Sequence, residues 1–236
     1  MTGEEQRGIA KYYIASFAYS KIFGCTWALD AFRENRCGNT NFPLQVKVNT
    51  QYQDEKSSFI AHYEEDGLTQ TPSVLGSISV SGNCTLQESN FLNVAGFGYP
   101  NNRDKSYNTN NVADFSWTGD SEYAVEIASP MDATSYSMLS FRIMKTAAPS
   151  SGDIDVALTI QDASGTHATF SITDYASIWN PADPTDRTSW VMQTVSIPLT
   201  DIHAAGIDLS EIKKITLDFS DQCTGQVYMD DLQFSE

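Results

Sequence analysis

The feature that most constrains the fold is a two-residue alternation of apolar and polar side chains in the second half of the chain. From about residue 76 to the end, short segments place an apolar residue at every second position, and clusters of turn-forming residues separate them. A period of two is typical of β-strands that bury one face. Eight segments show it: 112–117, 122–128, 138–145, 153–161, 166–174, 190–199, 213–219 and 226–234.

The inward faces can be read from this alternation. Leu139, Phe141 and Ile143 share one face of their segment, as do Val156, Leu158 and Ile160 of the next. The sequence Asp-Ala-Ser-Gly at 162–165 predicts a hairpin turn, and 209–212 can form one short helical turn. So many short strands at this spacing predict a mainly β fold, an antiparallel β-sandwich with jelly-roll connections.

A helical segment precedes the β-rich part. Thr2 stands three residues before Glu5, which is a capping-box spacing, and an apolar stripe at helical spacing continues to Gly24. A second, shorter helix is expected within 26–35. Alternation at 44–48 and 59–63 then predicts a β-hairpin. We therefore divide the chain into a helical segment (1–40), a hairpin or connector (41–75) and a β-sandwich (76–236).

The net charge of -16 is concentrated in the β-rich part. Residues 1–83 carry seven Lys and Arg against nine Asp and Glu, whereas residues 84–236 carry seven against twenty-one. Such an acidic surface repels phosphate backbones, so nucleic acid is excluded as a partner. No apolar run reaches the length of about 20 residues that a membrane span needs.

The cysteines and the N-terminus bear on the compartment. Cys25, Cys37, Cys84 and Cys223 show no zinc-binding spacing, and they can form a local loop (25 with 37) and a staple (84 with 223) or remain free thiols. The Asn/Ser/Thr-rich loops and few lysines favour a secreted or cell-surface protein. Because no signal peptide follows Met1, we expect the chain to be a fragment of a longer protein.

No complete active site is expected in this chain. It lacks a GxSxG nucleophile elbow, and its three histidines, at 62, 167 and 203, have no obvious nucleophile beside them in sequence. A triad assembled from distant segments stays open, as do paired carboxylates. Whether the chain is part of an enzyme is therefore uncertain from these residues.

Sugar recognition has a more specific signal. The apolar face of a pyranose stacks on an aromatic ring while its hydroxyl groups form hydrogen bonds, and two long polar loops carry aromatic residues. The alternative is that these rings anchor their own loops. The candidate ligand-binding residues are Trp179, Tyr175, Tyr99 and Tyr107.

Two stretches resemble known families. The run SWVMQTVSIPLTDI…LSEIKKITLDFS…GQVYMDDLQF resembles the closing strands of carbohydrate-binding-module and galactose-binding-like jelly rolls. This resemblance implies a structural Ca²⁺ with Asp230 as ligand; the alternative is an acid that protects an edge strand. GEEQRGIAKYYIASFAYSKIFG is similar to the last helix of secreted α/β-hydrolases of the lipase/esterase kind, some of which carry an appended β-domain.

Together these features favour the non-catalytic C-terminal region of a secreted α/β-hydrolase, whose catalytic domain would lie upstream of Met1. The sandwich would then be an accessory domain that binds a glycan or a polymeric substrate. The alternatives are a stand-alone carbohydrate-binding module and a structural or adhesive surface domain.

Overall fold

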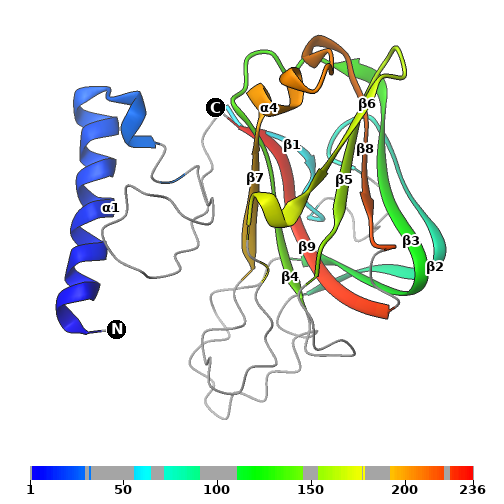
Figure 1. The fold of residues 1–236 in the computed structure, drawn as a ribbon, viewed down its shortest axis with the longest axis horizontal. Coiled ribbons are helices and arrows are strands. Elements are labelled where there is room, and N and C mark those ends of the chain that lie inside the picture. Colours follow the sequence, from blue (N-terminus) through cyan, green and yellow to red (C-terminus); the bar gives the residue numbers. More distant parts are fainter. Residues whose placement is uncertain are drawn as a thin grey trace.

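The computed structural model describes residues 2–29, 32, 56–64, 72–90, 111–145, 154–176, 178, 192–220 and 224–235. Its N-terminal element is the helix α1 (Gly3–Phe23), which lies to one side of the β-strands (Figure 1). Thr2 and Glu5 form the expected capping box, and Gly24 ends the helix in the left-handed conformation with φ 65°. A 3₁₀ turn, η1 (Thr26–Leu29), follows. Among the described residues, no helix has the length and apolar character that a bilayer span requires.

Nine antiparallel strands make up most of the rest of the described fold, and hydrogen bonds link all nine into one continuous sheet. Three short helical elements connect them: η2 (Ile172–Asp174), α4 (Leu199–Ala204) and η3 (Leu209–Glu211). The strands are β1 (Ser58–Ala61), β2 (Gly76–Asn90), β3 (Asn111–Met131), β4 (Met138–Lys145), β5 (Ala157–Asp162), β6 (His167–Ser171), β7 (Gln193–Pro198), β8 (Ile212–Asp218) and β9 (Thr224–Ser235).

The long strand β3 belongs to both layers of the sandwich. Its first half, 113–118, pairs with β9, and its second half, 122–126, pairs with β8. We call the layer β6-β5-β8-β3 sheet one and the layer β3-β9-β4-β7 sheet two. Strand β2 pairs with β3 along its whole length and so borders both sheets. The two segments expected at 112–117 and 122–128 are therefore one strand that continues from one sheet into the other.

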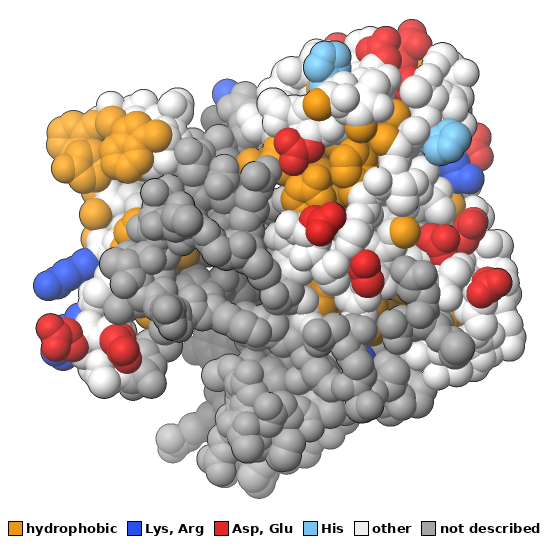
Figure 2. All heavy atoms as spheres, viewed as in Figure 1, with side chains coloured by type: hydrophobic (Ala, Val, Ile, Leu, Met, Phe, Trp, Pro, Cys, Tyr) orange, Lys and Arg blue, Asp and Glu red, His pale blue; other side chains and the backbone are white. Residues whose placement is uncertain are grey.

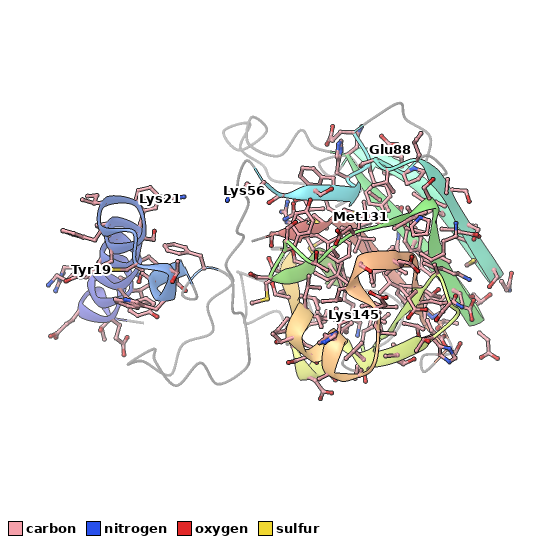
Figure 3. All side chains as sticks on the ribbon, turned by 90° about the horizontal axis from the view of Figure 1, so that it is seen from above. Tyr19, Lys21, Lys56, Glu88, Met131 and Lys145 are labelled. Atoms are coloured by element: carbon pink, nitrogen blue, oxygen red, sulfur yellow. The ribbon has the colours of Figure 1, made fainter. Side chains whose placement is uncertain are left out.

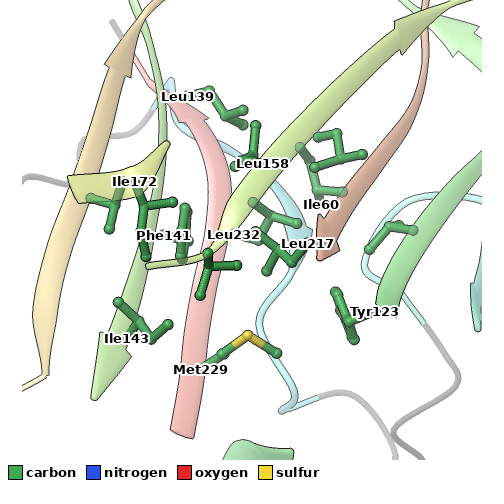
Figure 4. Close-up of a cluster of buried hydrophobic side chains, with 14 of the residues drawn as sticks. Ile60, Tyr123, Leu139, Phe141, Ile143, Leu158, Ile172, Leu217, Met229 and Leu232 are labelled. Atoms are coloured by element: carbon green, nitrogen blue, oxygen red, sulfur yellow. The ribbon is translucent and has the colours of Figure 1, made fainter. Parts of the chain in front are cut away.

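The core lies between the two sheets and is built from the alternation seen in the sequence (Figure 4). Leu139, Phe141 and Ile143 of β4 are buried, as predicted, and so are Leu158 and Ile160 of β5. At one end, three aromatic rings pack together: the Trp117 centroid lies 5.7 Å from that of Phe115 and 4.7 Å from that of Phe219. The mainly β, antiparallel sandwich expected from the sequence is confirmed.

Two features differ from, or add to, the sequence-based expectation. Strand β1, which was expected to form a hairpin with 44–48, pairs with the end of β9; its expected partner segment lies outside the described residues. Within β9, Asp231 adopts φ 52°. Val227 and Met229 face the core before that position and Leu232 and Phe234 face it afterwards, so Asp231 shifts the alternation by one residue.

Candidate functional site

The outward faces of the two sheets differ in chemistry. In sheet one, the outward residues form an ordinary solvated surface: Glu126 is exposed, and Gln161 and Lys214 are partly exposed. In sheet two, several outward polar side chains are almost completely buried. Asp114 and Asp230 each retain 3% exposure and Ser140 retains 5%. Because burying a polar group is costly unless it is hydrogen-bonded, the outward face of sheet two is an organised polar surface.

Strand register arranges these residues in rows across the sheet. Outward residues that lie opposite each other on neighbouring strands are about 4.8 Å apart along the hydrogen-bonding direction. We call this set the sheet-two face. Its three rows are Gln87, Asp114, Tyr228 and Met144; then Asp230, Arg142 and Thr194; then Gln233, Ser140 and Ser196, with Gln226 beside the first row.

Asp114 is the centre of an amide–carboxylate network at one end of this face. Gln87 Nε2 donates to its Oδ2 at 3.1 Å, and Gln226 Nε2 donates to its Oδ1 at 2.7 Å. Tyr228 lies beside it and packs with Val112, Met144 and Met192 in a hydrophobic cluster separate from the main core. Burial, followed by the negative charge of Asp114, raises the pKa of Tyr228 to about 12. This part of the face therefore combines an apolar cluster with amide and carboxylate groups that hydrogen bonds hold in place.

Arg142 bridges the side chains of two aspartates in the middle of the face. Its Nη1 lies 3.4 Å from Asp230 Oδ2 and 3.2 Å from Asp231 Oδ2. Burial raises the pKa of Asp230 to about 8, and the neighbouring Asp231 carboxylate adds to the rise, while Arg142 opposes it. The Arg142 side chain is 22% exposed, so its guanidinium can still donate hydrogen bonds to a ligand.

Three long connections leave the fold next to this face. Residues 91–110 connect the paired ends Asn90 and Asn111, residues 146–153 follow Lys145, and residues 179–191 precede Met192. Register places Met144, the neighbour of Lys145, opposite Tyr228. The predicted ligand-binding residues Tyr99, Tyr107 and Trp179 belong to the connecting segments and lie outside the described residues.

The fourth predicted ligand-binding residue, Tyr175, lies elsewhere. It follows η2 at the edge of sheet one and packs partly against the main core, with its ring centroid 6.3 Å from that of Phe170. Its hydroxyl group donates to Asp201 Oδ2 at 3.3 Å. The structure therefore does not bring Tyr175 together with the sheet-two face; its contacts are with β6 and α4.

The structure describes the predicted metal ligand Asp230 and two of the four cysteines. Asp230 is paired with Arg142, and within the described ranges no three His, Cys, Asp or Glu side chains gather as a metal site. These residues alone do not fit Ca²⁺, which takes six to eight oxygen ligands, and calcium stays a prediction. Cys25 and Cys84 are free thiols, whereas Cys37 and Cys223 lie outside the described residues.

Of the residues in the sheet-two face, the sequence analysis singles out Asp230 alone. The alternation identifies which residues face the core and assigns no role to the outward ones. The available signal was the presence of Asp114, Arg142 and Tyr228 at outward positions of three separate strands. Only the strand order brings these three strands side by side, and the order is not written in the alternation.

The chain matches one family model, and its fold is similar to solved structures. A family model described as carbohydrate binding domain 30 matches residues 49–236. An exo-β-agarase structure aligns with a TM-score of 0.51 and 15% sequence identity, covering 75% of this chain and 25% of that chain. The similarity shows a shared fold, and the chain spans a quarter of the length of that agarase.

Two carbohydrate-binding modules of Clostridium thermocellum are also similar. The family 11 module, solved with a β-1,3-1,4-mixed-linked tetrasaccharide, has a TM-score of 0.46 and 14% identity, covering 76% of this chain and 95% of that chain. The family 30 module of a cellulosomal cellulase has a TM-score of 0.40 and 16% identity, covering 56% and 78%. Comparison with curated protein sequences gives no match.

Proposed function

The chain belongs to the carbohydrate binding domain 30 family, and from this premise we propose that the sheet-two face is the surface that binds the glycan. A carbohydrate-binding role follows from the family; the location of the site is our inference. The observation that carries it is the contrast between the two outward faces. Among the described residues, only sheet two places guanidinium, carboxylate and amide groups in outward rows that also contain the apolar side chains of Met144 and Tyr228.

This chemistry suits a sugar chain. Sugar hydroxyl groups both donate and accept hydrogen bonds, and planar carboxylate, amide and guanidinium groups bind pairs of them. Arg142 and Asp231 retain 22% and 15% side-chain exposure, and Gln226 is also partly exposed. Because these groups are already held by each other, little conformational freedom is lost when a ligand replaces water. Trp179, Tyr99 and Tyr107 stay candidates for stacking, since their segments join the fold next to this face.

Variants of the two outward faces test the location of the glycan-binding site. Affinity gel electrophoresis against a panel of soluble polysaccharides identifies a glycan that retards the chain. Gln226→Ala is then expected to raise the dissociation constant about tenfold, the effect of losing about 1.4 kcal/mol of hydrogen bonding, and so to reduce the retardation. Arg142→Lys is expected to do the same, because a lysine keeps the charge but loses the planar fork.

Gln161→Ala is the control, since it removes the same side chain from the outward face of sheet one. If all three variants are retarded as strongly as the wild type, and circular dichroism confirms that they are folded, the sugar binds elsewhere.

We also propose that the sandwich serves as the accessory domain of a secreted hydrolase. Two observations support this: the similarity of α1 to the last helix of α/β-hydrolases, and the agarase, in which the matching region is a quarter of an enzyme. The reading frame upstream of residue 1 tests it. An in-frame GxSxG elbow followed by a histidine loop supports the proposal, and a frame that lacks them contradicts it.

A further inference from the structure

Strand β2 is the long border strand of the sandwich. It has 15 residues, and among the described strands it pairs with β3 alone. The strands at the other ends of the two sheets, β6 and β7, have five and six residues. In Figure 3, where Glu88 marks it, β2 stands at the outer border of the strands. Because every second residue of a border strand directs its backbone N–H and C=O groups away from its neighbour, such an edge can pair with a further strand.

The edge of β2 lacks the devices that usually protect a long edge from pairing. Proteins place lysine, proline or an inward-pointing charge on such strands, and residues 76–87 contain no charged residue and no proline. The chain nevertheless has a net charge of -16, and acidic side chains are spread over the face of the sandwich that Figure 2 shows. Val80 is 39% exposed, although it lies opposite the buried Tyr123 and so faces the core side of the strand.

The sequence of β2 is self-complementary about Gly82. Val80 and Cys84 stand at equal distances from this glycine, and so do Ile78 and Leu86. All four face the core side, because each lies opposite a buried residue of β3. We propose that β2 pairs with β2 of a second copy of this chain, antiparallel, with the twofold axis at Gly82.

This register matches the two faces of the strand. Residues that lie directly opposite each other on neighbouring strands share a face of the sheet. Val80 of one copy therefore lies opposite Cys84 of the other and is covered by it, while Ser79 lies opposite Thr85 on the polar face. A shift by one residue would place the apolar positions opposite polar ones. No like charges meet along 77–87, so the acidic character of the chain does not oppose the pairing.

Gly82 is also the point at which β2 passes from one sheet to the other. Its φ is 88°, and the register with β3 shifts between Gly82 and Cys84. The part of β2 before this point lies beside the segment of β3 that pairs with β8, and the part after it lies beside the segment that pairs with β9. A twofold axis at Gly82 places the irregular positions of both copies together. Sheet one of each copy then continues into sheet two of the other.

The pairing is independent of the proposed glycan site. Within the sheet-two face, Gln87 alone belongs to β2, so a dimer leaves the rest of that face open. Antiparallel pairing over 77–87 makes about ten backbone hydrogen bonds. Because each of them replaces hydrogen bonds to water, we expect a reversible dimer whose population rises with protein concentration.

Sedimentation velocity on the full chain over about a hundredfold range of concentration tests the pairing. The wild type is expected to shift from monomer towards dimer as the concentration rises. Val80→Lys is expected to weaken the dimer at least tenfold, because pairing would cover the new ammonium group. In the monomer this group reaches water, since Val80 is partly exposed, and circular dichroism verifies that the variant is folded.

Ala168→Lys is the matched control. Ala168 also faces the core side of an end strand, since it lies opposite the buried Ile160, but it belongs to β6. This variant, once shown to be folded, is expected to associate as the wild type does. A wild type that stays monomeric throughout would overturn the proposal. So would a dimer that Val80→Lys leaves intact or that Ala168→Lys weakens equally.

Oxidative cross-linking tests the register separately. In the proposed pairing, residue 80 of one copy lies opposite Cys84 of the other with Cα atoms about 4.5–5.5 Å apart, which suits a disulfide. Mild oxidation of Val80→Cys is therefore expected to give a covalent dimer, in which peptide mass spectrometry finds residue 80 linked to Cys84. Ser79→Cys, on the other face of the strand, should form no such link. Failure of Val80→Cys to cross-link, or a link between Ser79→Cys and Cys84, would show that the axis does not lie at Gly82.

Discussion

At the scale of the residue, the burial of Asp230 makes the stability of the fold depend on pH. Its side chain is 3% exposed, and its pKa of about 8 lies far above the usual value of 3.8 for an aspartate. The folded state therefore holds this proton in a pH range where the unfolded chain has lost it. Between about pH 4 and pH 8 the folded state binds more protons, so the contribution of this group to stability falls as the pH rises.

Asp230→Asn is expected to remove that part of the pH dependence. The variant should gain stability relative to the wild type as the pH rises from 5 to 8, by a few kcal/mol, since each pKa unit corresponds to about 1.4 kcal/mol. Urea unfolding at several pH values measures the difference. The control, Glu126→Gln, removes an exposed charge of β3 and should keep the wild-type slope. Parallel pH profiles for Asp230→Asn and the wild type would contradict this assignment.

At the scale of the element, the contact between β9 and β3 depends on one glycine. A Cβ atom at Gly225 would overlap the indole ring of Trp117, which is itself held by Phe115 and Phe219. Trp117 lies in the core at 2% exposure. The glycine is required here for the close approach of the ring to the backbone rather than for an unusual φ.

Gly225→Ala is expected to destabilise the sandwich by about 1–3 kcal/mol, because overpacking forces the ring or the strand to move. The shift of the urea midpoint measures this loss. In a Trp117→Leu background the same substitution should cost much less, since the overlapping ring is gone. Additive effects of the two substitutions would show that the ring and the glycine do not interact.

Individual elements were predictable to different degrees. The segment 138–145 was predicted with the bounds that β4 has, because its apolar residues alternate without interruption and turns bound it. The hairpin at 162–165 was also predicted, and β5 and β6 pair around it. The single strand β3 was split in two, because Thr118, Gly119 and Asp120 read as a turn. In the structure, Gly119 adopts φ 93° within a strand that continues from sheet two into sheet one.

At the scale of the whole molecule, the sequence predicts the fold class but does not show which residues meet in the sheet-two face. Alternation reports which residues face the core, but it does not report which strands are neighbours. Asp114, Arg142 and Tyr228 come together only because β9 lies between β3 and β4, which are far from it in sequence. The ligand-binding residues expected from the sequence are aromatic rings in loops, and three of these four, Trp179, Tyr99 and Tyr107, lie outside the described residues.

Hydrogen exchange with and without the bound polysaccharide tests the central claim that the sheet-two face binds the glycan. Strands β4 and β9 are neighbours in sheet two and carry most of the sheet-two face, whereas β5 and β6 stand at the far edge of sheet one. We expect the ligand to slow exchange in peptides covering 138–145 and 224–231 and to leave exchange in peptides covering 157–171 unchanged. Protection confined to 157–171, with none in β4 and β9, would contradict it.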